Sequence, residues 1–138
     1  MKIVIMDGQG GGMGRALVEK LHAAAPEMEL LAVGTNVLAT AAMLKAGASA
    51  GATGENAVRV ACRDADIIAG PIGMVLADAL LGEVTPEMAR CVASCPAKKV
   101  LLPMQKCHTQ IAGVASLSTQ ELVEDAVRRI LEICRNAL

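Results

Sequence analysis

A cluster of glycines near the start of the chain has the residue types and spacing for binding a phosphate. It follows an apolar run, precedes a helical pattern, and consists of Gly8, Gln9, Gly10, Gly11, Gly12, Met13 and Gly14. Glycines at such a turn let backbone N–H groups approach a phosphate without an intervening Cβ, and the next helix directs the positive end of its dipole to the same place. The turn is therefore predicted to bind a phosphate-bearing ligand; the alternative is tight strand-to-helix packing with no ligand.

Asp7 stands at the edge of this cluster. A carboxylate beside a bound phosphate repels it unless a cation intervenes or the side chain is committed to backbone N–H groups. Two interpretations follow for Asp7: it faces the ligand, or it caps the turn.

Polar or glycine-rich residues at three other places are predicted to line the same ligand. Asn56 has an amide suited to a ribose or carbonyl, and Glu55 has a carboxylate suited to act as a base, although a helix cap with an acidic first turn also explains both. Glycines after a later strand suit close backbone approach to a ligand or a plain tight turn. The residues at these places are Thr35, Asn36, Glu55, Asn56, Gly70, Pro71, Ile72 and Gly73.

Cysteine and histidine occur close together in two places. Cys91 and Cys95 share a helix face, and Cys107 precedes His108, but this spacing is not a recognised zinc pattern, so no metal site is predicted. The two helix cysteines are predicted to lie in the core. Sequence neighbours on a strand point apart, which disfavours Cys107 and His108 as a nucleophilic pair.

The composition excludes several classes of function. The chain has 138 residues, a net charge of −1 and no Phe, Trp or Tyr, so it lacks the basic excess and the aromatic faces that bind nucleic acids. Any pocket for a base must be aliphatic. The chain has no secretory pattern and no apolar run of about 20 residues, so we expect a cytoplasmic protein with no membrane segment. Five cysteines argue against a disulfide framework.

The elements that must position these residues alternate along the chain. Continuously apolar runs predict strands at residues 2–6, 29–33, 66–69 and 100–102, with a short final strand at 111–114, whereas 48–54 is too short and small to assign. Such strands between helices are typical of parallel sheets. We predict an α/β fold: a compact three-layer Rossmann-like domain over residues 1–138, with a mostly parallel sheet and helices on both faces. Ligands of such folds bind at the carboxyl ends of the strands.

Capping residues predict where the helices begin. Asn36 begins a helix that closes at Gly47, Thr85 with Pro86 begins another, and Ser118 with Glu121 forms a capping box for the last. Thr53 or Asn56 is expected to cap a helix over 57–62.

The segment from Met74 to Leu81 is apolar nearly all round and is predicted to be a helix. A helix without a polar face must be covered on every side. We therefore predict a homodimer that buries this helix.

The glycine spacing resembles a known family. Gly8, Gly12 and Gly14 fit the pattern GxxxGxG, and the run from Gly12 to Val18 resembles the opening of the short-chain dehydrogenase/reductase family. The resemblance implies that Gly8, Gly12, Met13 and Gly14 line a dinucleotide. The catalytic tyrosine of that family has no counterpart here.

The residues after the second strand also depart from that pattern. They are Gly34, Thr35 and Asn36, in place of the acid that holds an NAD ribose or the arginine that accommodates an NADP phosphate.

Taken whole, the chain is similar to a family of short bacterial proteins of uncharacterised function. The matching segments are residues 7–14, 34–36, 43–47, 51–56, 66–73 and 82–86. This resemblance implies a family but no activity.

The leading hypothesis is a binding or sensor subunit that holds a nucleotide or dinucleotide at the glycine turn. The ligand is left open between NAD(P) and another phosphate-bearing nucleotide. One rival is an oxidoreductase-type enzyme that uses Glu55, Cys107 or His108 with a partner completing its site; another is a structural assembly protein without a ligand. Whether the protein is an enzyme is therefore left open.

Overall fold

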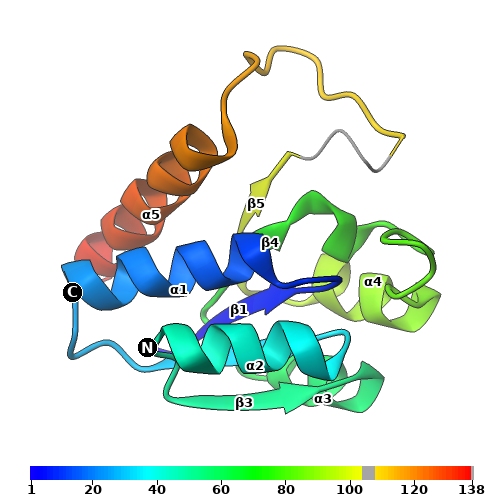
Figure 1. Cartoon of the computed structure of the whole chain (residues 1–138), viewed down its shortest axis with the longest axis horizontal. Helices are drawn as coiled ribbons and strands as arrows, with labels where there is room; N and C mark the ends of the chain where they lie inside the picture. The colour runs from blue at the N-terminus through cyan, green and yellow to red at the C-terminus, as the bar shows by residue number, and fades with distance from the viewer. Residues whose placement is uncertain (104–107, 138) are drawn as a thin grey trace.

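Five parallel strands form one sheet in the computed structural model, which describes residues 1–103 and 108–137 (Figure 1). The order across the sheet is β3-β2-β1-β4-β5. The chain moves outward from β1 in one direction and then returns to its other side, which creates a switch point between β1 and β4. The strands are β1 (Ile3–Asp7), β2 (Leu30–Gly34), β3 (Ala50–Thr53), β4 (Ile67–Pro71) and β5 (Lys98–Leu102).

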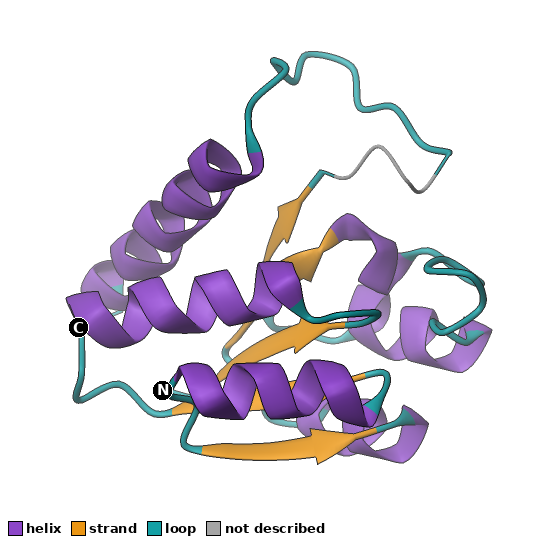
Figure 2. Cartoon of the chain, viewed as in Figure 1, coloured by secondary structure: helices purple, strands orange, loops and turns teal. Residues whose placement is uncertain are grey.

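Helices cover both faces of this sheet (Figure 2). One apolar core joins the sheet to α1, α2 and α5, and the other joins it to α3, α4 and a short 3-10 helix, η1. The predicted three-layer α/β fold is confirmed. The helices are α1 (Gly12–Ala24), α2 (Val37–Ala46), α3 (Glu55–Cys62), η1 (Ile72–Val75), α4 (Pro86–Ser94) and α5 (Thr119–Asn136).

The apolar pattern of β1 follows from burial on both faces of the sheet. Ile3 and Ile5 point into one core, whereas Val4 and Met6 point into the other. Successive side chains of a strand point to opposite faces, so a strand covered on both sides must be apolar at every position. Each fully buried side chain of this kind contributes roughly 1.5–3 kcal/mol.

Three predicted helix starts are confirmed. The Asn36 side chain accepts from the Ala39 amide at 2.8 Å, and the Thr85 hydroxyl accepts from the Met88 amide at 3.1 Å. Ser118 forms the predicted capping box. These contacts span three residues, so local sequence determines them.

The predicted cap of α3 is wrong. Gly54 occupies that position, and no side chain caps the helix. The Thr53 hydroxyl instead bonds to the Thr40 hydroxyl at 2.7 Å, and the Asn56 side chain accepts from Arg59. Part of the segment 48–54, to which the sequence assigns no element, forms β3. Its small side chains give no strand signal, and its backbone is held by hydrogen bonds to β2.

The predicted helix from Met74 to Leu81 is also wrong. The chain makes η1 and then a loop, residues 76–85, which we call the β4–α4 loop. Left-handed backbone angles interrupt any helix there, with φ of 64° at Asp78, 56° at Leu80, 58° at Leu81 and 87° at Gly82. The loop closes on itself through the Asp78 amide, which donates to the Val84 carbonyl at 2.8 Å.

The strand predicted at 111–114 does not form, because residues 112–113 make a turn. Residues 108–118 run in an arch away from the sheet toward α5, so no neighbouring strand pairs with them (Figure 1). Within residues 1–103 and 108–137, no helix is long and apolar enough to span a membrane.

Candidate functional site

The glycine turn, Thr35 and Asn36 lie together at the carboxyl edge of the sheet. The parallel pairing of β1 with β2 brings Asp7 beside Gly34, and the Thr35 amide donates to the Asp7 carbonyl at 3.0 Å. The strand ends therefore position these predicted residues side by side.

Asp7 caps the glycine turn with its carboxylate. Oδ1 accepts from the Gly8 amide at 2.8 Å, and Oδ2 accepts from the Gly14 amide, in the first turn of α1, at 2.6 Å. The side chain is buried, and this burial raises the pKa of Asp7 above its ordinary value, with a smaller rise from the negative charge of Glu83. The amides of Gly14 and Gly8 oppose that rise. An amide committed to Asp7 is not available to a phosphate.

Three glycines of the turn are explained by packing. A Cβ at Gly14 would lie 2.8 Å from the Cβ of Asp7, and one at Gly8 would lie 2.5 Å from Thr35 Oγ1, which is held by its hydrogen bond to Glu83. Gly11 has a left-handed φ of 73°, and a Cβ there would lie 2.7 Å from the Ala39 backbone. These positions require glycine whether or not a ligand binds.

Gly10 and Gly12 have no such packing reason. Both are exposed, and a Cβ at either would meet no atom within 4 Å. Their amides donate to no acceptor within the part of the chain that the structure describes. Because Gly12 is the first residue of α1, its amide points outward at the positive end of the helix dipole.

Glu83 brings three of the predicted residues together. Its Oε1 accepts from the Gln9 amide at 2.8 Å, the Thr35 hydroxyl at 2.7 Å and Asn36 Nδ2 at 2.8 Å. Partial burial acts to raise the pKa of Glu83, but the bonds from Gln9, Thr35 and Asn36 together hold it below its ordinary value. Sequence reasoning missed Glu83, because it lies in a loop far along the chain. The available signals were an acid after Gly82 and the place of residues 82–86 among the segments that resemble the family.

The residues predicted after the β4 run also lie at the carboxyl edge of the sheet, but Gly70 is explained by the packing of β4 against β1. A Cβ there would lie 2.2 Å from the Met6 carbonyl oxygen, so β1 and β4 could not approach as they do. Pro71 ends β4 and is buried, and Ile72 and Gly73 begin η1.

Glu55 and Asn56 are committed to other contacts. Glu55 Oε1 accepts from the Thr85 hydroxyl at 2.6 Å, and its Oε2 lies 3.5 Å from Arg59 Nη2. Asn56 accepts from the same Arg59. These bonds join the start of α3 to the start of α4 and make no link to the glycine turn.

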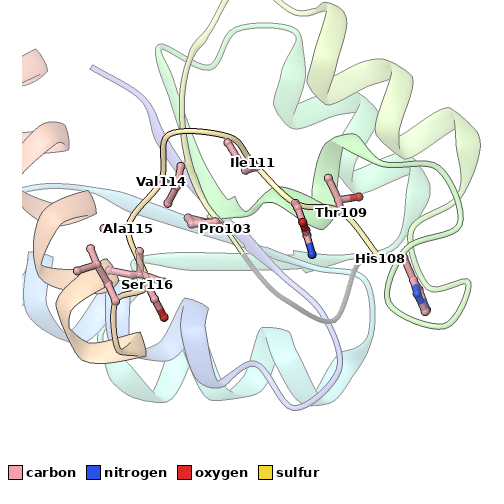
Figure 3. A pocket seen from close by; sticks show the side chains of 10 residues that line it. Pro103, His108, Thr109, Ile111, Val114, Ala115 and Ser116 are labelled. Atoms are coloured by element: carbon pink, nitrogen blue, oxygen red, sulfur yellow. The ribbon is translucent and has the colours of Figure 1, made fainter.

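Two cavities lie away from the predicted residues. One, of about 700 Å³, is open on one side and is bordered by the arch, the end of β5 and the start of α5; Figure 3 shows Pro103, Ile111 and Val114 at its border. His108 also lines it, whereas Cys107 lies outside the described residues. The other, of about 550 Å³, lies at the opposite edge of the sheet near Lys2 and Asp66. No residue predicted to bind a ligand lines either cavity.

The described cysteines are free, and Cys91 lies in the core as predicted, while Cys95 is only partly buried. Burial raises the pKa of Cys62 to about 12, helped by the neighbouring Cys95, and burial also raises the pKa of Cys91. Thiols of this kind are poor nucleophiles, because the thiolate is the reactive form. Residues 1–103 and 108–137 contain no group of three or more acidic, cysteine or histidine side chains that could hold a metal ion.

Comparisons with known proteins give a family and, among solved structures, a distant similarity. The family described as "Domain of unknown function (DUF3842)" matches residues 2–135. None of the proteins with curated descriptions matches the chain. A solved structure described as a dodecameric FMN-dependent Ubix-like decarboxylase from Escherichia coli O157:H7 is 21% identical, with a TM-score of 0.47, over 94% of this chain and 76% of that chain.

Proposed function

Since the chain belongs to that family, whose function is unknown, we propose from its own residues that it binds a phosphate-bearing nucleotide at the carboxyl edge of β1 and β2. The phosphate lies against the amides of Gly10 and Gly12. NAD(P) and simpler nucleotides are the candidate ligands. The protein acts as a binding or sensor subunit.

The exposed glycines carry this proposal. Packing accounts for Gly8, Gly11 and Gly14 but not for Gly10 or Gly12, whose surroundings are open. Glycine in an exposed, unstrained position lowers stability, because it increases the conformational entropy of the unfolded chain. Close approach of the backbone to a ligand would explain why glycine is present there. The N-terminus of α1 favours a negative ligand at this point.

Aliphatic side chains beside the turn suit the base of the nucleotide. Val37 is 73% exposed and Leu38 is 68% exposed, and both follow Asn36 at the start of α2. Large apolar side chains with this exposure gain free energy when a flat base covers them. They supply the aliphatic surface that a chain without aromatic residues requires.

A binding role is favoured over catalysis by the state of the nearby acids. Asp7 and Glu83 are the acidic side chains bonded to the turn among the described residues, and each is held by backbone or side-chain donors. A general base works best with a pKa near the operating pH, whereas the pKa of Glu83 is lowered, and both oxygens of Asp7 already accept backbone hydrogen bonds. The oxidoreductase alternative would use Glu55, Cys107 or His108; no hydrogen bond joins Glu55 or His108 to the turn within the described part of the chain, and Cys107 lies outside it.

The ultraviolet spectrum of the purified protein tests the proposal. The chain has no Phe, Trp or Tyr, so any nucleotide carried through purification should dominate the spectrum. Added nucleotide should raise the melting temperature of the wild type, because a ligand that binds only the folded state stabilises it. Gly12→Val should abolish this rise, whereas Ala23→Val, a similar change at the far end of α1, should keep it. A clean spectrum and no rise with NAD, NADP, ATP or ADP would favour the structural alternative.

We also propose that the chain self-associates as a homodimer through the β4–α4 loop rather than through a helix. Met74 and Leu80 are buried within the chain, so they are not available to a partner, but Leu81 is 96% exposed. Light scattering should give the mass of a dimer for the wild type and of a monomer for Leu81→Ser. A wild-type mass of 14.2 kDa at all concentrations would contradict the proposal.

A further inference from the structure

We infer that Glu83 is the acceptor for the ribose hydroxyls of the bound nucleotide and selects a ribose that carries no phosphate. This inference rests on the proposed function. It names the class of ligand: nucleotides with a free ribose diol, such as NAD and ADP, rather than NADP.

The position of the Glu83 carboxylate supports this role. Doubly wound nucleotide-binding sheets carry an acid at the end of the second strand, where it accepts from a ribose hydroxyl. Here Thr35 and Asn36 follow β2, and both donate to Glu83 Oε1, at 2.7 Å and 2.8 Å. The β4–α4 loop therefore delivers a carboxylate to the place where β2 itself has none.

One oxygen of the carboxylate is left for a ligand. All three hydrogen bonds to Glu83 use Oε1, and Oε2 has no donor within residues 1–103 and 108–137. The amide of Gln9, one residue from Gly10, is one of the three donors, so the carboxylate adjoins the proposed phosphate position. A nucleotide places its ribose next to its phosphate, and Oε2 is then an acceptor for the hydroxyls.

The β4–α4 loop holds Glu83 as a fixed part of this site rather than as a movable lid. Val84 is fully buried and Leu80 is 7% exposed, so they anchor the loop on both sides of Glu83. The Val84 carbonyl also accepts from the Asp78 amide. Moving Glu83 outward would expose these apolar side chains and leave the Gln9, Thr35 and Asn36 donors without their acceptor.

The negative charge of Glu83 explains the selection against a ribose that carries a phosphate. No lysine or arginine is paired with Glu83 among the described residues. The lowered pKa of Glu83 keeps the carboxylate ionised at neutral pH, and the Asp7 carboxylate adds negative potential close by. A phosphate on the ribose would replace the hydroxyl that donates to Oε2 and would meet this negative oxygen directly, whereas the nucleotide's other phosphate lies against the Gly10 and Gly12 amides at the positive N-terminus of α1.

Equilibrium dialysis with NAD and NADP tests the inference on the intact chain. The wild type should bind NAD at least about tenfold more tightly than NADP. Glu83→Gln keeps Oε1 for the three donors but replaces Oε2 with an NH₂ group. It should weaken NAD binding by about tenfold and remove the preference over NADP. Glu27→Gln, the same charge change at the turn after α1, should behave as the wild type. ADP and its deoxyribose counterpart provide a second pair of probes.

The outcomes separate the inference from the proposed function. Tighter binding of both nucleotides by Glu83→Gln would mean that Glu83 occupies the ligand's place, and it would overturn the inference alone. Nucleotide binding that does not depend on Glu83 would do the same. A wild type that binds neither pair of probes would overturn the proposed function and the inference with it. Circular dichroism should show that each variant is folded.

Discussion

Gly70→Ala is expected to lower the free energy of unfolding by about 3 kcal/mol or more, or to prevent folding. A Cβ at Gly70 would lie 2.2 Å from the Met6 carbonyl oxygen, which belongs to the backbone of the central strand. A flexible side chain could rotate away, but a strand paired on both sides cannot. The expected loss therefore comes from separating β1 from β4.

Gly12→Ala is the matched control, because its Cβ would meet no atom within 4 Å. Its expected effect is a stabilisation of about 0.4–1 kcal/mol, since alanine reduces the entropy of the unfolded chain. Urea unfolding followed by circular dichroism measures both variants; fluorescence is unsuitable because the chain has no Trp. Equal stability of Gly70→Ala and Gly12→Ala would contradict the close approach of the two strands.

Asp7→Ala is expected to destabilise the fold by about 2–4 kcal/mol. It leaves the Gly8 and Gly14 amides without the carboxylate that accepts from them in a buried position. Asp7→Asn should cost less, because it keeps one acceptor oxygen, but its NH₂ group then faces the other amide. Urea unfolding at neutral pH compares the two variants, and a stability of Asp7→Ala equal to that of the wild type would contradict the cap.

The pH dependence of these variants has a defined sign. Burial raises the pKa of Asp7 above 3.8, so the stability from this group is fully present below that pH and is lost as the pH rises through the raised value. The cost of Asp7→Asn should therefore shrink as the pH rises from 3.8. The pKa of Glu83 lies below 4.5, so its contribution is present above that pH and is lost on acidification. The destabilisation caused by Glu83→Gln should therefore shrink as the pH falls below 4.5. If the destabilisations caused by Asp7→Asn and Glu83→Gln changed with pH in the same direction, one of the two pKa shifts would be contradicted.

The candidate site was predictable only in part. Glycine spacing identified the turn, and apolar runs located the two strands that position Gln9, Thr35 and Asn36, because hydrophobic periodicity and turn chemistry are local properties. The meeting of these residues at Glu83 was not predictable. It depends on a loop that joins β4 to α4 and reaches across the edge of the sheet to β2.

The wrong predictions have the same origin. The apolar segment from Met74 to Leu81 has a helical composition, but a loop with left-handed residues buries both Met74 and Leu80 in the same core. The small residues of β3 carry no strand signal and form a strand because β2 offers an unpaired edge.

By itself, the sequence determined the α/β alternation, the helix caps at Asn36 and Ser118, and the glycine turn after β1, because each depends on residues within a few positions of one another. Only the tertiary structure decided which glycines serve packing and which face solvent. It also decided that Asp7 caps the turn and that Glu83 meets Gln9, Thr35 and Asn36 at the carboxyl edge of the sheet. These outcomes depend on contacts between residues far apart in the chain, and close packing of the sheet and its helices determines such contacts.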